Sequence, residues 1–278
     1  MENKDFAVFI LTHARPDNVK TYTTLKKCGY TGKIYLIVDN EDKSIDKYIS
    51  NFGLDNIKIF NKKQMADSID EGNNFDNRKV IIHARNACFK IAEELGIKYF
   101  VQFDDDYYYF GYRYSTGAKI IKNIDKVFDL MLNYFKSTNI TSICFSQGGD
   151  HIGGFSGIKL KRKAMNSFFC STDKPFQFIG SINEDVNTYT SLGCKGYLFF
   201  TFTNIQLDQK DTQSNNGGMT DEYALSGTYV KSFHSVMMHP SGVKISMMNA
   251  NNVRLHHSIK WINTTPMIIN EKYKKINQ

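Results

Sequence analysis

The chain has 278 residues, of which 41% are hydrophobic and 14% aromatic, so it can bury a large core and is not intrinsically disordered. It contains no run of about 18 apolar residues, the length that a membrane-spanning helix requires. Its charged N-terminus leads directly into an apolar segment, which argues against a signal peptide. We therefore expect a cytoplasmic protein that does not bind membranes.

The formal net charge is +7, and basic residues cluster at Lys159–Lys163 and Lys272–Lys275. Such clusters attract polyanions, although surface lysines also serve solubility. The five cysteines are scattered without a Cys-x-x-Cys pair, which favours buried free thiols over zinc ligands or disulfides.

Apolar runs alternate with amphipathic helical segments through the first half of the chain. The pattern predicts strands at Phe6–Leu11, Lys33–Val38, Ile57–Phe60 and Lys98–Phe103, with helices near residues 15–27, 43–51 and 77–95 between them. This alternation is typical of βαβ units, so we predict an α/β, Rossmann-like fold with a mainly parallel sheet. The chain lacks both the Gly-x-Gly-x-x-Gly and the P-loop signatures, which argues against ordinary dinucleotide oxidoreductases and P-loop NTPases.

The second half is less regular. A helix is predicted near residues 120–135, a strand at Ser142–Ser146 and an aromatic strand at Tyr197–Phe202. The glycine-rich segment Gly148–Gly154 suits a lid or an acceptor loop, and Gln209–Gly218 is polar. Neither an internal repeat nor a convincing linker divides the chain, so we predict one domain over residues 1–278.

Three adjacent carboxylates, Asp104–Asp106, follow the predicted strand at Lys98–Phe103. They repel one another, and a divalent cation such as Mg²⁺ or Mn²⁺ is the simplest compensation. In an extended segment Asp104 and Asp106 share one face and Asp105 points away. We therefore predict that Asp104 and Asp106 bind the metal, with a solvated acidic turn as the alternative.

Ligands of open parallel sheets bind outside the carboxyl ends of the strands. The segments Thr12–Arg15, Asp39–Glu41 and Asp104–Asp106 all lie at such ends. We expect them to form a nucleotide-diphosphate site in which Arg15 and Asp39 hold the nucleoside. Arg85, near a predicted helix start, can meet phosphate oxygens, with a surface helix charge as the alternative. The cofactor-binding residues predicted from the sequence are Thr12, Arg15, Asp39, Arg85, Asp104 and Asp105.

A second acidic pair, Glu184-Asp185, begins a helical pattern. Either carboxylate can accept a proton from an acceptor hydroxyl, and we favour Asp185 as this general base. An equally supported alternative is that these carboxylates only cap the start of the helix. The late histidines His239 and His256-His257 are candidates to complete the metal shell or to contact phosphate, and we place His239 among the metal ligands.

The strand that ends in an Asp-x-Asp signature after several βα units resembles the GT-A fold of nucleotide-sugar glycosyltransferases. An ordered set of segments is similar to the TET/JBP-associated glycosyltransferases, which include the base J glucosyltransferase and phage enzymes that glycosylate hydroxylated DNA bases. These segments are Ile10–Pro16, Ala84–Asn86, Gln102–Asp106, Asn183–Asp185, Gly217–Thr220, Gly227–Tyr229 and His239–Ser241. The resemblance extends from about Phe6 to His257.

The resemblance implies a UDP-sugar donor, a divalent metal held by the Asp triplet, and double-stranded DNA with hydroxymethylated pyrimidines as acceptor. Residues 1–106 would then bind the nucleotide sugar and residues 107–278 the acceptor. Because a separate DNA-binding module is missing, we assign Lys161, Arg162 and Lys163 to DNA phosphates. The alternatives are a GT-A enzyme acting on a protein or glycan, and a non-catalytic nucleic-acid-binding protein with a transferase-like fold. The sequence leaves open the sugar, the modified base, the stereochemical outcome and the oligomeric state.

Overall fold

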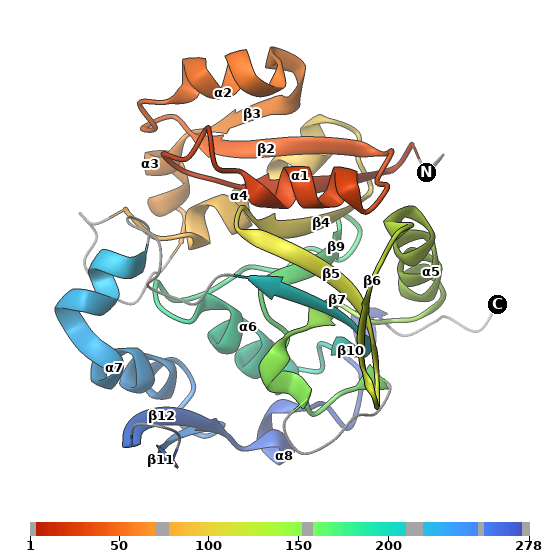
Figure 1. The fold of residues 1–278 in the computed structure, drawn as a ribbon. Helices are drawn as coiled ribbons and strands as arrows, with labels where there is room; N and C mark the ends of the chain where they lie inside the picture. The colour runs from red at the N-terminus through yellow and green to blue at the C-terminus, as the bar shows by residue number, and fades with distance from the viewer. Residues whose placement is uncertain (1–3, 70–77, 152–157, 210–218, 250–252, 274–278) are drawn as a thin grey trace.

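The computed structural model describes residues 4–69, 78–151, 158–209, 219–249 and 253–273. Their centre is a ten-stranded sheet (Figure 1). In order across the sheet, the strands are β3 (Ile57–Phe60), β2 (Lys33–Asp39), β1 (Phe6–Leu11), β4 (Tyr99–Asp104), β9 (Ser167–Ser171), β7 (Ser142–Ser146), β10 (Phe199–Gln209), β5 (Tyr107–Tyr114) and β6 (Gly117–Ile120), with β8 (Ile158–Lys159) paired to β10. The predicted α/β fold is confirmed.

Helices cover both faces of the sheet because its central strands are apolar on both sides. In β1, Phe6, Val8 and Ile10 pack in one core, while Ala7, Phe9 and Leu11 pack in the other. The first core also takes side chains from α1 (Lys20–Lys27), α2 (Ile45–Phe52) and α5 (Ile124–Ser137). The second takes side chains from α4 (Ile82–Glu94) and α6 (Glu184–Gly193). A continuous apolar strand is what burial on both faces requires.

The direction of the strands changes at β4. Strands β3, β2, β1 and β4 pair in parallel, as the alternating sequence pattern predicts. Beyond β4, β9 runs antiparallel to β4 and to β7, and β5 runs antiparallel to β10. The Asp triplet therefore lies where the parallel part of the sheet ends and the chain turns back into β5.

The C-terminal part adds a separate layer at one edge of the molecule (Figure 1). The long helix α7 (Met219–Met238) packs on a hairpin of β11 (Val243–Asn249) and β12 (Val253–Ile259), and α6 packs on α8 (Trp261–Thr264). The short elements are α3 (Lys62–Ala66), η1 (Leu54–Asn56), η2 (Gly148–His151) and η3 (Glu271–Tyr273). No described helix is long and apolar enough to cross a membrane.

Several sequence expectations need refinement. The helix expected from Arg15 begins at Lys20, and the aromatic strand extends to Gln209. In the proposed lid, Gly148–His151 forms a 3-10 helix, and residues 152–154 lie outside the described residues, as do residues 210–218 of the polar stretch. All five cysteines are free thiols, four of them buried, while Cys194 is exposed.

Candidate active site

The first turn of α1 holds the Asp triplet in place through the backbone. The Thr21 hydroxyl donates to the carbonyl oxygen of Asp104 at 2.5 Å and accepts from the Tyr107 amide at 2.9 Å. The Thr21 amide donates to the carbonyl oxygen of Asp105 at 3.0 Å. The turn that carries the three carboxylates is therefore fixed by a helix that begins beside the end of β1.

Asp105 joins the triplet to the segment after β1. Its carboxylate accepts from the Thr12 hydroxyl at 2.8 Å and from Nη1 of Arg15 at 3.0 Å. Burial nonetheless raises the pKa of Asp105, since the effects of Arg15 and Thr12 offset only part of the desolvation. The structure thus brings together three of the residues assigned to cofactor binding, with Asp105 as the internal partner of the other two.

Arg85 connects the triplet to the second acidic pair. Its Nη2 donates to Asp104 at 3.0 Å and its Nε donates to Glu184 at 2.8 Å. Arg85 has 0% exposure, and its guanidinium carbon lies 5.6 Å from the ring of Phe168 and 5.7 Å from that of Phe178. The alternative of a surface helix charge is wrong. Arg85 is a buried counter-ion of the carboxylates, and its contact with a phosphate stays a prediction.

The carboxylates remain short of positive charge despite Arg85. Burial, together with repulsion from Asp106 and Glu184, raises the pKa of Asp104 to about 7. Burial and repulsion from Asp105 raise the pKa of Asp106 to about 6. Among the described residues, Asp106 Oδ1 is buried and has no hydrogen-bond partner. A cation would relieve both the repulsion and the missing bond, so the two side chains fit the oxygen-rich coordination of Mg²⁺ or Mn²⁺.

A complete metal centre of protein ligands is absent from the described part of the chain, where no group of three or more His, Cys, Asp or Glu could hold an ion. The described residues therefore do not bring His239 together with Asp104 and Asp106, and its role as a metal ligand stays a prediction. His239 lies in the turn between α7 and β11, where its carbonyl oxygen accepts from the amides of Gly242 and Val243. A Cβ atom at Gly242 would lie 2.2 Å from Nε2 of His239, so the ring packs against this turn.

Asp39 lies at the end of β2, as predicted, but its carboxylate is engaged. It lies 2.6 Å from Nδ1 of His13 and 3.4 Å from Nζ of Lys62. Burial opposes ionisation, yet His13 and Lys62 outweigh it and lower the pKa of Asp39. A nearby carboxylate, Asp42, accepts from the amide of Ala14, whose φ is 54°. Both acids thus shape the segment after β1, and direct contact of Asp39 with a nucleoside stays a prediction.

Glu184 and Asp185 begin α6 and are both buried. Asp185 accepts from the Val186 amide at 2.7 Å, and burial together with repulsion from Glu184 raises its pKa. The residue before the pair, Asn183, has a left-handed φ of 55° and forms no side-chain cap. It donates instead to the carbonyl oxygen of Lys231 at 2.8 Å, which ties α6 to α7. Backbone strain of this kind is frequent at functional sites.

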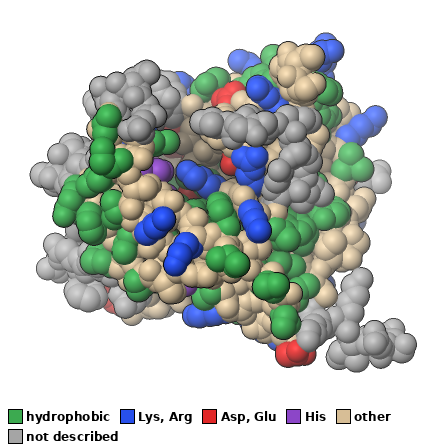
Figure 2. All heavy atoms as spheres, turned by 90° about the horizontal axis from the view of Figure 1, so that it is seen from below, with side chains coloured by type: hydrophobic (Ala, Val, Ile, Leu, Met, Phe, Trp, Pro, Cys, Tyr) green, Lys and Arg blue, Asp and Glu red, His purple; other side chains and the backbone are tan. Residues whose placement is uncertain are grey.

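Three cations, Lys163, Lys231 and Arg254, lie beside the acidic pair together with His256, and we call these four residues the basic cluster. Burial lowers the pKa of Lys231, as do Arg254 and Lys163, while Asp185 and Glu184 act in the opposite direction. Burial and the same three cations lower the pKa of His256 to about 4. Figure 2 shows lysine and arginine side chains gathered on one face, with acidic and histidine atoms between them.

Sequence reasoning found Lys163 but missed Lys231. Nothing near Lys231 in the chain marks it, because its position is set by the packing of α7 against α6 and β12. The two other residues assigned to DNA differ in environment: Lys161 is exposed, while Arg162 donates through Nη1 to the carbonyl oxygen of Asp150. Only Lys163 of the three therefore belongs to the basic cluster.

An α/β sheet with a carboxylate triplet at the end of β4 is what the sequence resemblance to GT-A glycosyltransferases implies. The model of the TET-Associated Glycosyltransferase family matches residues 6–218. The chain therefore belongs to this family and is a glycosyltransferase, as the sequence resemblance implies. Among curated proteins, none matches the chain.

The solved structures that are similar to the chain include the following two. The S. aureus TarS fragment 1–349 is 11% identical with a TM-score of 0.43, over 73% of this chain and 60% of that one. Glucosyl-3-phosphoglycerate synthase from Mycobacterium tuberculosis, in complex with Mn²⁺, UDP and phosphoglyceric acid, is 11% identical with a TM-score of 0.45, over 95% of this chain and 90% of that one.

Proposed function

We propose that the protein transfers a sugar from a UDP-sugar to the hydroxyl of a hydroxymethylated pyrimidine in DNA, in a metal-dependent reaction. One observation supports this most strongly: the single guanidinium of Arg85 contacts Asp104 at 3.0 Å and Glu184 at 2.8 Å. It therefore couples the predicted metal-binding carboxylates to the acidic pair that contains the predicted general base. A glycosyl transfer needs a cation at the departing diphosphate on one side of the reacting carbon and a base at the acceptor hydroxyl on the other.

The donor side of the proposed site consists of Asp104 and Asp106. A bound Mg²⁺ or Mn²⁺ would be held by these two carboxylates and would stabilise negative charge on the departing diphosphate. The basic cluster adds cations that attract the phosphate groups of either substrate. Thr12 and Arg15, held by Asp105, line the neighbouring segment where the nucleoside of the donor would lie.

Asp185 acts on the acceptor side. As the new bond forms between the acceptor oxygen and the anomeric carbon, the bond from that carbon to the diphosphate oxygen breaks, and UDP leaves. The hydroxyl proton passes to the Asp185 carboxylate. Burial and the neighbouring Glu184 raise the pKa of Asp185, which makes it a better proton acceptor than an ordinary aspartate.

The DNA acceptor has weaker support than the sugar donor. It comes from the family description, the net charge of +7 and the basic segment at Lys161–Lys163. The decisive experiment measures UDP release with Mn²⁺ and a panel of acceptors: duplexes with hydroxymethylcytosine or hydroxymethyluracil, matched unmodified duplexes, and protein or glycan acceptors. Stimulation by the hydroxymethylated duplexes alone supports the proposal. Stimulation by glycans or proteins would replace the DNA acceptor, and no release with any acceptor would favour a non-catalytic binding protein.

A further inference from the structure

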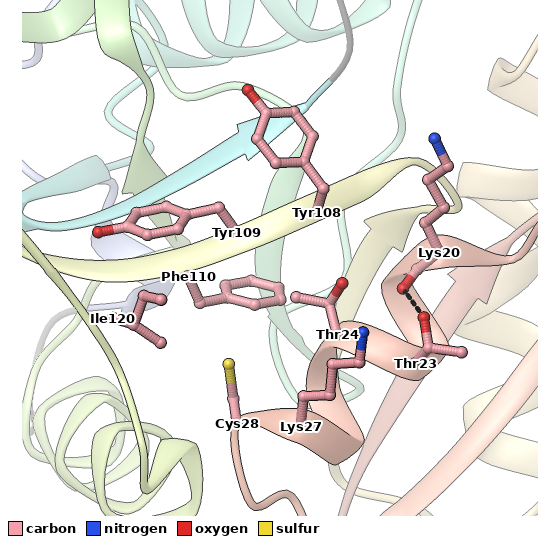
Figure 3. A pocket seen from close by; sticks show the side chains of 9 residues that line it. All are labelled: Lys20, Thr23, Thr24, Lys27, Cys28, Tyr108, Tyr109, Phe110 and Ile120. Carbon is pink, nitrogen blue, oxygen red and sulfur yellow. Dashed lines mark hydrogen bonds between the residues drawn. The ribbon is translucent and has the colours of Figure 1, made fainter.

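A groove lies between α1 and β5, the strand that follows the Asp triplet. We call it the α1–β5 groove; it has a volume of about 340 Å³, within the range of small-ligand sites, roughly 300–1,000 Å³. Lys20, Thr23, Thr24, Lys27 and Cys28 line one side, and Tyr108, Tyr109, Phe110 and Ile120 line the other (Figure 3).

One wall of the groove is attached to the candidate active site. Lys20 lines the groove and directly precedes Thr21, whose amide donates to the carbonyl oxygen of Asp105 at 3.0 Å. Thr24, in the same wall, donates to the carbonyl oxygen of Tyr107 at 2.9 Å, so the helix is attached directly to the start of β5. The wall of the groove is therefore attached to the turn that carries the proposed metal ligands.

The two walls are basic and aromatic. The helix α1 contains three lysines and no acidic residue, and the hairpin of β5 and β6 contains Arg113 and Lys119 and likewise no acidic residue. No carboxylate is among the described residues that line the groove; burial and the charge of Asp208 raise the pKa of Tyr109 in its wall. A positive groove with aromatic side chains is the usual form of a single-stranded nucleic-acid site.

A β-bulge directs Tyr108 out of the sheet. In the pairing of β5 with β10, Asp208 lies opposite Tyr109 and Gln209 lies opposite Tyr107, which leaves Tyr108 as the extra residue. Its side chain is 56% exposed, only two positions after Asp106. Bulges near active sites frequently re-aim a side chain. The side chain of Tyr109 instead packs over Gly111. A Cβ atom built on this glycine would lie 2.2 Å from the hydroxyl oxygen of Tyr109.

The buried acidic pair explains why such a surface is needed. Asp185 is 4% exposed, so a base inside a duplex cannot reach it, and enzymes that modify bases extrude the target from the stack. Extrusion leaves the neighbouring nucleotide without one stacking partner. The exposed ring of Tyr108 supplies a face for that base, and Lys20 and Lys27 in the lining of the same groove supply cations for its phosphate.

We propose that the α1–β5 groove binds the nucleotide next to the target base, with its base against Tyr108 and its phosphate near Lys20 and Lys27. This inference rests on the proposed function, because it assumes a DNA acceptor. It adds a recognition surface on the N-terminal half of the chain, away from the basic segment at Lys161–Lys163.

The test compares Tyr108→Ala and Lys27→Gln with the wild type on two acceptors, a hydroxymethylated duplex and the free hydroxymethylated nucleoside. Loss of one stacked base is expected to raise KM for the duplex about 5- to 150-fold in Tyr108→Ala. Tyr108→Phe should restore it, and turnover of the nucleoside should not change. In Lys27→Gln, the slope of log K for the duplex against the logarithm of the salt concentration should become shallower by about 0.9.

The matched control is Lys26→Gln, which removes the same charge from the adjacent position. Lys26 is exposed and lies 5.8 Å from the ring of Tyr22, outside the groove. If the wild type glycosylates the duplex while Tyr108→Ala and Lys27→Gln retain its KM and salt dependence, the groove assignment is wrong and the proposed function survives. If the wild type glycosylates neither acceptor, both proposals are wrong.

Discussion

The two sides of the candidate site carry opposite imbalances of charge. At the end of β4, burial and, to a lesser extent, the crowding of carboxylates raise the pKa of Asp104 to about 7 and that of Asp106 to about 6. In the basic cluster, burial and neighbouring cations lower the pKa of His256 to about 4 and also lower that of Lys231. A bound cation would balance the charge of the first side, and a bound anion would balance that of the second. A metal-bound nucleotide diphosphate is one ligand that supplies both.

The largest expected effect concerns the general base. Asp185→Asn keeps a side-chain oxygen that can accept from the Val186 amide, now 2.7 Å away, but removes the basicity. We expect kcat to fall by about 10² to 10⁴, with UDP affinity and melting temperature close to wild type. The control is Asp55→Asn, at an exposed position. A near-normal kcat would identify Asp185 as a structural residue of α6.

The second largest effect is expected when Arg85, which links Asp104 to Glu184, is replaced. Arg85→Met leaves Asp104 and Glu184 without their buried counter-ion, and loss of one partner of a buried ion pair costs about 3–5 kcal/mol. We expect that loss in denaturant unfolding at neutral pH. Lys90→Met on the same helix removes an exposed lysine, 4.0 Å from Glu94, and should cost little. A similar, small loss in both variants would contradict the role given to Arg85.

The pH dependence of the reaction distinguishes Asp185 from an ordinary aspartate. Burial and Glu184 raise its pKa, so the carboxylate becomes protonated, and inactive as a base, at a higher pH than the usual value of about 3.9 allows. The logarithm of kcat/KM, measured at saturating Mn²⁺, should therefore decline as the pH falls through the raised pKa and level off above it. Asp185→Asn should lose this decline in its residual activity. Retention of the decline would assign it to another group.

The smallest effect is expected for the basic segment at Lys161–Lys163. Replacement of all three residues with Gln should weaken duplex binding and lower its salt dependence by about 0.9 in log K for each phosphate that the variant no longer neutralises. Lys163 should contribute most, because it alone is part of the basic cluster. A triple Gln variant of the exposed Lys90, Lys126 and Lys136 is the control. Equal salt dependence in both triple variants would show that the segment only solubilises the protein.

The contrast between the two sides also explains what the sequence could predict. The strands β1 to β4 are apolar on both faces, and their carboxyl ends must converge, so the fold and the position of Asp104–Asp106 follow from local patterns. The burial of Arg85 does not, because a helix position with this charge is ordinarily exposed. Lys231 and the bulge at Tyr108 also depend on partners distant in the chain, namely β12 and β10. The position of His239 likewise depends on the turn before β11, against which its ring packs, and its role as a metal ligand stays a prediction.

The central claim is that the carboxylates at the end of β4 bind a metal-bound nucleotide diphosphate. It is tested most directly by calorimetric titration of UDP into wild type and Asp106→Asn, each with and without Mn²⁺. Asp106 is the informative position, since its Oδ1 is buried without a hydrogen-bond partner among the described residues. We predict that Mn²⁺ strengthens UDP binding to the wild type and has no effect on the variant, whose melting temperature stays near wild type. Equal enhancement by Mn²⁺ in both proteins would contradict the account.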